Sequence, residues 1–359
     1  HPDPHRGTII TGPSNRHLID ATAGNVTIRG VTFRHDDLAG KDGMCVRPGD
    51  GLSVIDCTIE RAANVIVTDF GYQLDGLYFA GNRQVGTDTI RRYVLGLFGD
   101  STNVVATDNT FNNSNDEHIF RLSGAYDRTD FGGTRFVSVT GNDLSNLSER
   151  NGGPPRDMGK SAVILQVGAF AYVGDNRLVG ANGVGPLPRG PESIRSKDTR
   201  FRIARWEDNV VEGTMQFDHG AEHVRYVGGS ITSETANAVE FHGGSAEHGR
   251  SLVDVVMEDF VITGKAGHAS LLRVWPGAQP GEITFRNGRV EQAGQMEGQG
   301  WMPPIRMESL MDAVLEDIVA TRVPAGKWGQ GSVVLAGSQN EKTSYKQPGD
   351  LRGVTEVER

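Results

Sequence analysis

The sequence of 359 residues predicts an all-β protein, a single-stranded right-handed parallel β-helix of about ten or eleven coils. Two observations predict this fold class. Short runs of alternating apolar and polar residues recur along nearly the whole chain, and no segment has the apolar periodicity of a long amphipathic helix. The composition agrees, because 48 glycines, with abundant asparagine, valine and threonine, favour short strands and turns.

The alternating runs return at a regular distance. They begin at residues 25, 51, 76, 103, 135, 170, 201, 223, 252, 282 and 313, about 22 to 35 residues apart. A second short run that ends on glycine precedes most of them, for example TMQFDHG (214–220) and AVEFHGG (238–244). Strands at this period indicate a solenoid, because one coil cannot bury its apolar side chains alone. A β-propeller needs a longer period, about 40 to 45 residues.

We expect one β-helix domain at residues 1–346, followed by a C-terminal tail at residues 347–359. Two segments rich in glycine and proline, near 148–160 and 180–192, are expected to protrude from the coils as loops. The chain has two cysteines, Cys45 and Cys57, and their spacing does not decide whether they form a disulfide.

Charge and hydropathy limit the possible partners. A net charge of -9 argues against nucleic acid, which needs a basic binding surface. No run of apolar residues is long enough to span a membrane. The chain opens with HPDPHRG and neither an initiator methionine nor a leader, so we expect a processed, secreted or periplasmic protein whose signal segment is not in this chain.

Strand alternation selects candidate site residues. In TMQFDHG, Met215 and Phe217 are expected to face the core, which turns Gln216 and Asp218 outward. In HIFRLSG (118–124), the same argument turns Ile119, Arg121 and Ser123 outward. Stacked coils lie about 4.8 Å apart, so outward residues of successive coils form a row. The candidates are Arg121, Gln166, Asp218, Glu240 and His242. An ordinary solvated sheet face would show the same pattern at any single position.

The segment RGPESIRSKDTRFRIARW (189–206) is strongly basic within an acidic protein. Its cations are Arg189, Arg195, Lys197, Arg200, Arg202 and Arg205, against the two acids Glu192 and Asp198. Such a segment beside the polar row suggests an anionic substrate that is steered toward it. The alternative is a solvated edge of alternating charges.

Two motifs in this region resemble a known family. ESIRSK (192–197), followed by GTMQFDHG (213–220), resembles the paired motifs of chondroitinase B and its related alginate lyases, within the pectate-lyase-like β-helix superfamily. The resemblance covers residues 189–220 and implies that Lys197 is the catalytic base, with His219 closing the second motif. It also implies that Glu192 helps to hold a calcium ion.

The sequence departs from that family at three positions. The catalytic arginine of the family falls on Asp218, a second calcium-binding glutamate falls on Gly190, and Asp198 replaces a serine. The expected function is nevertheless that of a polysaccharide lyase acting on an acidic, uronate-containing polysaccharide by β-elimination. Charge neutralisation, a base and a proton donor are required.

We assign Lys197 as the base, Arg121 to neutralise the carboxylate, and His219 or His242 to deliver the proton, with Asp218 in the same site. The expected substrate-binding residues are Arg189, Arg195, Arg200, Gln166 and Glu240. Calcium is a possible cofactor, although Glu192 with Asp198 or Asp218 is a small ligand set.

Two other functions remain open. Asp218 and Glu240 could act as the carboxylate pair of a glycoside hydrolase. A non-catalytic β-helix could instead bind glycans through aromatic side chains, and the candidates are Tyr172, Trp206, Tyr226 and Trp275. Most aromatic residues in this pattern are nevertheless expected to pack in the core or at corners.

Overall fold

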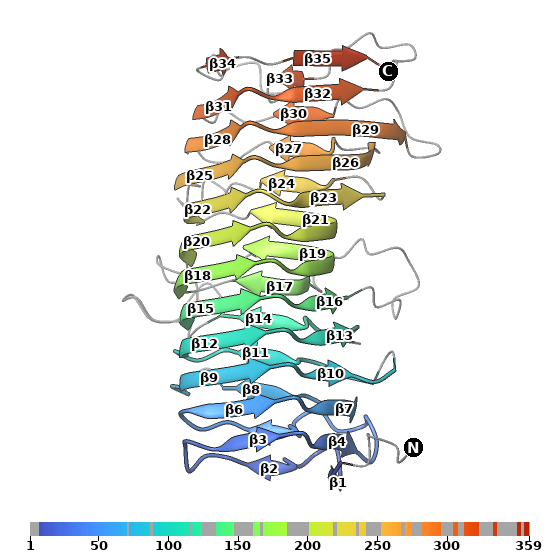
Figure 1. Ribbon diagram of the computed structural model, residues 1–359, viewed down its shortest axis with the longest axis vertical. Coiled ribbons are helices and arrows are strands. Elements are labelled where there is room, and N and C mark those ends of the chain that lie inside the picture. The colour runs from blue at the N-terminus through green and yellow to red at the C-terminus, as the bar shows by residue number, and fades with distance from the viewer. Residues whose placement is uncertain are drawn as a thin grey trace, which may run out of the picture. The chain divides into compact units, whose positions relative to one another are not determined.

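The computed structural model describes residues 7–69, 72–86, 89–114, 116–123, 134–146, 161–165, 168–184, 201–217, 221–234, 237–241, 253–266, 270–274, 282–295, 304–307, 312–322, 333–335, 350–352 and 355–358. In these residues all regular structure is strand, and the strands pair in parallel (Figure 1). The chain folds as a right-handed parallel β-helix, as the sequence predicts. It forms two compact units: unit 1 contains residues 1–181 and 190–199, and unit 2 contains residues 182–189 and 200–359.

Unit 1 has three parallel ladders, to which each coil adds one strand. Ladder 1 is built from β3 (Thr27–Arg29), β6 (Leu52–Ile55), β9 (Asp75–Ala80), β12 (Thr102–Thr107), β15 (Thr134–Thr140) and β18 (Gly168–Gly174). Ladder 2 is built from β1 (Ile9–Gly12), β4 (Thr32–His35), β7 (Thr58–Arg61), β10 (Arg83–Gln84), β13 (Thr110–Asn112), β16 (Asp143–Ser145) and β19 (Arg177–Val184). Ladder 3 is built from β2 (Ile19–Asp20), β5 (Val46–Arg47), β8 (Ile66–Thr68), β11 (Leu95–Leu97), β14 (Phe120–Leu122) and β17 (Ser161–Leu165).

Unit 2 repeats this arrangement. Its ladder 1 is built from β20 (Phe201–Glu207), β22 (Glu222–Val227), β25 (Val253–Glu258), β28 (Glu282–Arg286), β31 (Asp312–Glu316) and β34 (Asp350–Arg352). Ladder 2 is built from the first half of β21 (Val210–Phe217), β23 (Ser230–Ser233), β26 (Val261–Ala266), β29 (Arg289–Gln295), β32 (Val319–Arg322) and β35 (Thr355–Glu358). Ladder 3 is built from the second half of β21, β24 (Val239–Phe241), β27 (Leu272–Val274), β30 (Ile305–Met307) and β33 (Val333–Leu335).

The corner between ladders 1 and 2 explains the recurring glycine and aspartate. In unit 1 the first corner residue has a positive φ in every coil: Gly30, Asp56, Gly81, Asp108, Gly141 and Asp175. Glycine and, to a lesser degree, aspartate tolerate this left-handed conformation. The two alternate because a β-carbon at Gly141 would lie 2.6 Å from Oδ1 of Asp108 in the coil before.

The next corner residue forms a buried asparagine ladder, made of Asn82, Asn109, Asn142 and Asn176. Oδ1 of Asn109, Asn142 and Asn176 each accepts both the backbone and the side-chain N–H of the asparagine one coil earlier, at 2.8 to 3.0 Å. Oδ1 of Asn82 accepts the backbone N–H of Cys57 at 2.9 Å. The ladder satisfies buried polar groups that a corner would otherwise leave unpaired. It thereby fixes the register of the coils in unit 1.

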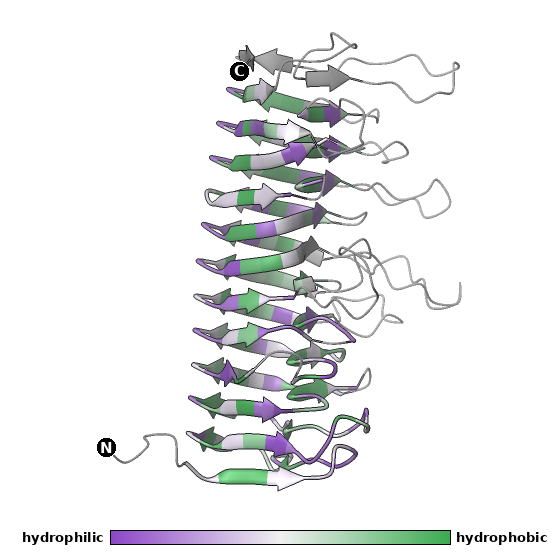
Figure 2. Ribbon diagram, turned by 90° about the vertical axis from the view of Figure 1, so that its right-hand side faces the viewer, coloured by the Kyte–Doolittle hydropathy of each residue, from purple (hydrophilic) through white to green (hydrophobic). Residues whose placement is uncertain are grey.

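Hydrophobic and hydrophilic residues follow one another along the strands (Figure 2), and the apolar ones are the buried ones. In unit 2, Met215 and Phe217 are fully buried, as predicted, and Phe217 stacks on Phe241 with centroids 4.8 Å apart. In unit 1, however, Ile119 and Ser123 are also fully buried. Their predicted outward position is wrong, because these residues flank a strand of only three residues and turn into the core at its ends.

Several other predictions from the sequence can be compared with the structure. The expected loop near 148–160 lies outside the described residues, and residues 180–184 of the second expected loop belong to β19. Within the expected tail, β34 and β35 pair with β31 and β32. Cys45 and Cys57 are both buried and free, and burial raises the pKa of each thiol. In the described part of the chain, no helix could span a membrane.

Candidate functional site

Arg121 is the predicted site residue whose surroundings the structure defines best. It is the middle residue of β14, between Phe120 and Leu122, which are fully buried in the core of unit 1. Arg121 is half-buried and leaves the opposite side of the strand. In ladder 3 it is in register with Gly96 of β11 and Ile164 of β17.

Gly96 leaves the space next to Arg121 open to two rings. A β-carbon at Gly96 would lie 2.9 Å from Cγ of Tyr93 and 3.0 Å from Cε2 of Phe98. Without it, the rings of Tyr93 and Phe98 meet edge to face over the strand, with centroids 5.2 Å apart. The Arg121 guanidinium carbon lies 4.9 Å from the centroid of Phe98, and this cation–π contact restrains the long side chain.

Tyr93 is the polar partner of Arg121. Nη1 of Arg121 donates to the Tyr93 hydroxyl at 3.3 Å. Burial is the main reason why the pKa of the Tyr93 phenol is raised to about 12. The positive charge of Arg121 lowers this pKa, whereas Glu117 raises it through its charge and a hydrogen bond. The phenol is therefore protonated at neutral pH. The neighbouring guanidinium would stabilise a phenolate formed by loss of that proton.

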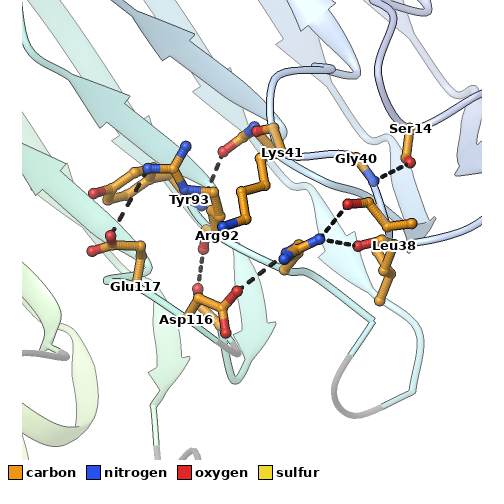
Figure 3. Close-up of polar contacts among 12 residues, drawn as sticks. Ser14, Leu38, Gly40, Lys41, Arg92, Tyr93, Asp116 and Glu117 are labelled. Atoms are coloured by element: carbon orange, nitrogen blue, oxygen red, sulfur yellow. Dashed lines mark hydrogen bonds and ion pairs between the residues drawn. The ribbon is translucent and has the colours of Figure 1, made fainter.

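Arg92 and Glu117 complete a group that we call the Arg121 cluster (Arg92, Tyr93, Phe98, Glu117 and Arg121). The guanidinium carbon of Arg92 lies 5.4 Å from the centroid of the Tyr93 ring, and its Nη2 lies 3.9 Å from Oε1 of Glu117. Figure 3 shows Arg92, Tyr93 and Glu117 close together. The cluster combines two guanidinium groups and one carboxylate, so its net charge is positive.

A surface segment at residues 36–43, here called the strap, is fixed beside the cluster. Arg91 donates from Nη1 to the carbonyl oxygens of Leu38 and Ala39, both at 2.6 Å. Nε of Arg91 donates to Asp116 at 3.1 Å. Arg91 is oriented from both ends by these contacts, so it holds the strap rather than a ligand.

Asn64 connects the strap to Tyr93. Its Nδ2 donates to the carbonyl oxygen of Lys41 at 2.7 Å, and its Oδ1 accepts the backbone N–H of Tyr93 at 3.5 Å. Lys41 therefore lies on the same side of unit 1 as Arg92 and Tyr93 (Figure 3). It is the one cation of the strap, which also carries Asp36, Asp37 and Asp42.

Unit 2 carries a second polar group on ladder 3, which we call the Glu240 row (Gln216, Glu240, Arg273 and Arg306). These residues are in register on β21, β24, β27 and β30. Gln216 and Glu240 are each only 5% exposed, so they are covered rather than solvated. Nδ2 of Asn237 donates to Oε1 of Glu240. In this row the carboxylate of one coil is followed by a guanidinium group in each of the next two coils.

Arg121 and Glu240 are the two predicted site residues within the described residues. The others lie outside them: Gln166, Arg189, Glu192, Arg195, Lys197, Arg200, Asp218, His219 and His242. The row drawn through Arg121 passes through Ile164, two residues before Gln166. The aromatic candidates Trp206 and Tyr226 are buried in the core of unit 2 and cannot stack on a sugar.

The residues that sequence analysis missed are Tyr93, Arg92, Phe98, Glu117 and Lys41. The segment RRYVLGLFG (91–99) contains three of them, and its paired arginines before a tyrosine are a usable signal. Glu117 and Lys41 approach from other coils, which a single strand pattern does not reveal. Among the described residues, no three His, Cys, Asp or Glu side chains are grouped closely enough to hold a metal ion.

Comparison with known proteins adds no family to this description. No protein-family model matches the chain, and a search of curated proteins finds no match.

Proposed function

We propose that the protein is a polysaccharide lyase that cleaves an acidic, uronate-containing polysaccharide by β-elimination. The observation that carries the proposal is the contact between Arg121 and Tyr93, which joins a cation to a protonated phenol on the outer side of a core strand. The resemblance of residues 189–220 to chondroitinase B and the alginate lyases supports the same chemistry and a place in the pectate-lyase-like superfamily.

β-Elimination has three chemical requirements: neutralisation of the uronate carboxylate, a base for the proton on the adjacent carbon, and an acid for the leaving oxygen. In the proposal Arg121 neutralises the carboxylate, because its guanidinium can bind a carboxylate through two N–H groups. Tyr93 is the proposed acid, because a pKa of about 12 keeps its proton in place until a strongly basic oxygen develops. Its side chain is 3% exposed, so this role requires its hydroxyl to be uncovered when the substrate binds.

The elimination is then a single balanced rearrangement. The base takes the proton from the carbon next to the carboxylate, and the C–H electron pair forms the new double bond. The glycosidic C–O bond breaks, and the departing oxygen takes the proton of Tyr93. Lys197 is the base that the resemblance implies, while His219 and His242 are the alternative proton donors from the sequence.

The distribution of charge favours an anionic substrate. The chain carries a net charge of -9, yet Arg92 and Lys41 lie close together (Figure 3), and Arg121 contacts Tyr93, the ring next to Arg92. The basic residues Arg189, Arg195 and Arg200 are proposed to extend the substrate-binding surface. A local positive field in an acidic protein steers polyanions to one place and repels them elsewhere. Such a substrate accords with a secreted or periplasmic location.

Incubation with alginate, chondroitin sulfate, dermatan sulfate or pectate tests the proposal. Elimination raises the ultraviolet absorbance of an unsaturated uronate. We expect Arg121→Ala to lower the rate by about 100-fold, as is typical when a charge-stabilising group is removed. The matched control is Arg177→Ala, because Arg177 is an exposed arginine paired with Asp143 at 3.0 Å. Equal rates for the two variants would contradict the role of Arg121.

A second pair of variants tests the base. Lys197→Ala should abolish the absorbance change, whereas Lys265→Ala should not, since Lys265 is exposed and paired with Glu234 at 3.0 Å. The resemblance also implies a calcium ion at Glu192, which a comparison of rates before and after EDTA tests. No step is assigned to calcium, because Glu192 lies outside the described residues.

New reducing ends without the absorbance change would favour the hydrolase alternative with Asp218 and Glu240. Such an enzyme needs a second carboxylate about 5 to 9.5 Å from the first. The described register neighbours of Glu240 are Gln216 and Arg273, neither of which is an acid. Asp218 itself lies outside the described residues, so the absorbance assay decides between the two reactions.

A further inference from the structure

Two phenylalanines of unit 1 are exposed on ladder 1, which is not the ladder that carries Arg121. Phe136 of β15 is 55% exposed and Phe170 of β18 is 44% exposed. Their rings are parallel within 5°, with centroids 5.1 Å apart. We call them the phenylalanine pair. Exposed single apolar residues are common, but two stacked aromatic rings in water form a binding surface.

The backbone conformation of the pair is unfavourable for phenylalanine. Phe136 has a φ of 51° and Phe170 a φ of 57°, both in the left-handed region. The equivalent position in the two preceding coils is occupied by Gly76 and Asn103, residue types that tolerate this conformation. For other residues it costs about 1 to 2 kcal/mol each. The same ladder position in unit 2 also has a positive φ, at Ile203 and His223, so the conformation belongs to the coil. What distinguishes the pair is that two aromatic rings stand at this position and remain half exposed, which a binding role explains.

The side chains around the pair suit a sugar. The Tyr172 ring lies against Gly174, where a β-carbon would be 2.6 Å from the Tyr172 hydroxyl and 2.7 Å from two ring carbons. Tyr172 is half-buried on β18, two residues after Phe170 and on the same side of the strand. One ring therefore lies flat on the sheet beside two that stand out from it. The C–H faces of a pyranose ring pack against aromatic surfaces of this kind.

Arg135 indicates the charge of the ligand. It directly precedes Phe136, and its Nε is buried without a hydrogen-bond partner in the part of the chain that the structure describes. Nε itself is covered, but the Arg135 side chain as a whole is half-buried, so a ligand would meet the guanidinium through its other N–H groups, whose natural partner is a carboxylate or sulfate. The combination of aromatic rings with this donor fits an acidic sugar better than a neutral sugar or an apolar protein surface.

We infer that the phenylalanine pair, with Tyr172 and Arg135, forms a secondary binding site for an acidic polysaccharide on ladder 1 of unit 1. The site holds the polymer without acting on it. The choice of an acidic sugar as the ligand rests on the proposed function, whereas the site itself is argued from the exposed rings and their backbone.

The test uses binding rather than cleavage. The full chain carrying Arg121→Ala is run in native gels that contain alginate or chondroitin sulfate, and its retardation gives a dissociation constant. In that background, Phe136→Asn with Phe170→Asn removes both rings, and asparagine tolerates the left-handed backbone. We expect the dissociation constant to rise about tenfold or more, with an unchanged or higher thermal midpoint. The control is Val85→Asn, since Val85 is 48% exposed after β10 of ladder 2.

Arg135→Gln should weaken binding of the acidic polymers and leave any retardation by neutral dextran unchanged. An unchanged dissociation constant in the double variant would overturn the inference. So would size-exclusion data in which the wild type is a dimer and the double variant a monomer with equal polymer affinity, because the rings would then join two copies of the chain. Ring-dependent binding without any lyase activity would refute the proposed function and leave the site standing.

Discussion

Removal of one amide from the asparagine ladder should destabilise unit 1 strongly. Asn109 is fully buried, and its side chain makes four hydrogen bonds. Oδ1 accepts the backbone N–H and Nδ2 of Asn82 at 2.9 and 3.0 Å. Nδ2 donates to the carbonyl oxygen of Phe79 and to Oδ1 of Asn142, both at 2.9 Å. We therefore expect Asn109→Ala to affect three neighbouring coils at once.

The size of the effect follows from the groups left behind. Two donors of Asn82 and the carbonyl of Phe79 lose a partner, whereas Oδ1 of Asn142 keeps the backbone N–H of Asn109. Each unsatisfied buried group costs about 1 to 3 kcal/mol. Water entering the cavity recovers part of this cost. The expected loss is about 3 to 5 kcal/mol, a large part of the stability of about 5 to 15 kcal/mol that is typical of a domain.

Native-state hydrogen exchange with mass spectrometry measures this loss locally. Peptides that cover β9, β12 and β13 should lose protection in Asn109→Ala. The four tryptophans lie at positions 206, 275, 301 and 328, so tryptophan fluorescence follows the C-terminal part of the chain separately. The control is Asn112→Ala, because Asn112 is half-buried and its side chain makes no hydrogen bond among the described residues. A difference of less than about 1 kcal/mol between the two variants would refute the role given to the ladder.

Two further predictions concern pH. His35 is fully buried, its Nδ1 accepts the N–H of Ala63 at 3.1 Å, and its Nε2 donates to the carbonyl of Arg16 at 3.2 Å, so burial lowers its pKa and favours the neutral ring. The neutral His35 ring contributes stability that is present above about pH 6.5 and is lost as the pH falls through the depressed pKa. Thermal midpoints between pH 7 and 5 should therefore fall more steeply in the wild type than in His35→Gln. Parallel curves for the two proteins would contradict this prediction. The second prediction is that Tyr93→Phe lowers kcat by about 100-fold. Because the pKa of Tyr93 is about 12, the wild-type rate should show no loss from its ionisation below about pH 11. A rate that falls with a midpoint near pH 10, the ordinary tyrosine pKa, would count against Tyr93 as the acid.

The fold could be predicted from the sequence because its signals are local. Left-handed corner residues such as Asp108 and Gly141 repeat once per coil and mark the end of each ladder 1 strand in unit 1, and from Gly81 onward each is followed by a buried asparagine. Side-chain alternation then assigns the inner face, and it succeeds for Met215 and Phe217. It fails for Ile119 and Ser123, because alternation ends where a three-residue strand turns into a corner.

The candidate site could be predicted only in part. Arg121 follows from alternation on its own strand, but its partners do not. Tyr93 and Phe98 reach it because Gly96 leaves room for their rings, a relation between neighbouring coils that depends on exact register. The outward position predicted for Glu240 as a substrate-binding residue does not tell whether other parts of the chain cover it, and it is only 5% exposed.

The most direct test of the proposed lyase is the mass of its products. Wild-type protein is incubated with alginate or chondroitin sulfate, and the released oligosaccharides are weighed by mass spectrometry. Elimination predicts fragments that each lack one water relative to a hydrolysis product, and these fragments should disappear with Arg121→Ala but not with Arg177→Ala. Fragments with the full mass of hydrolysis products, or none from any acidic polysaccharide, would contradict the assignment.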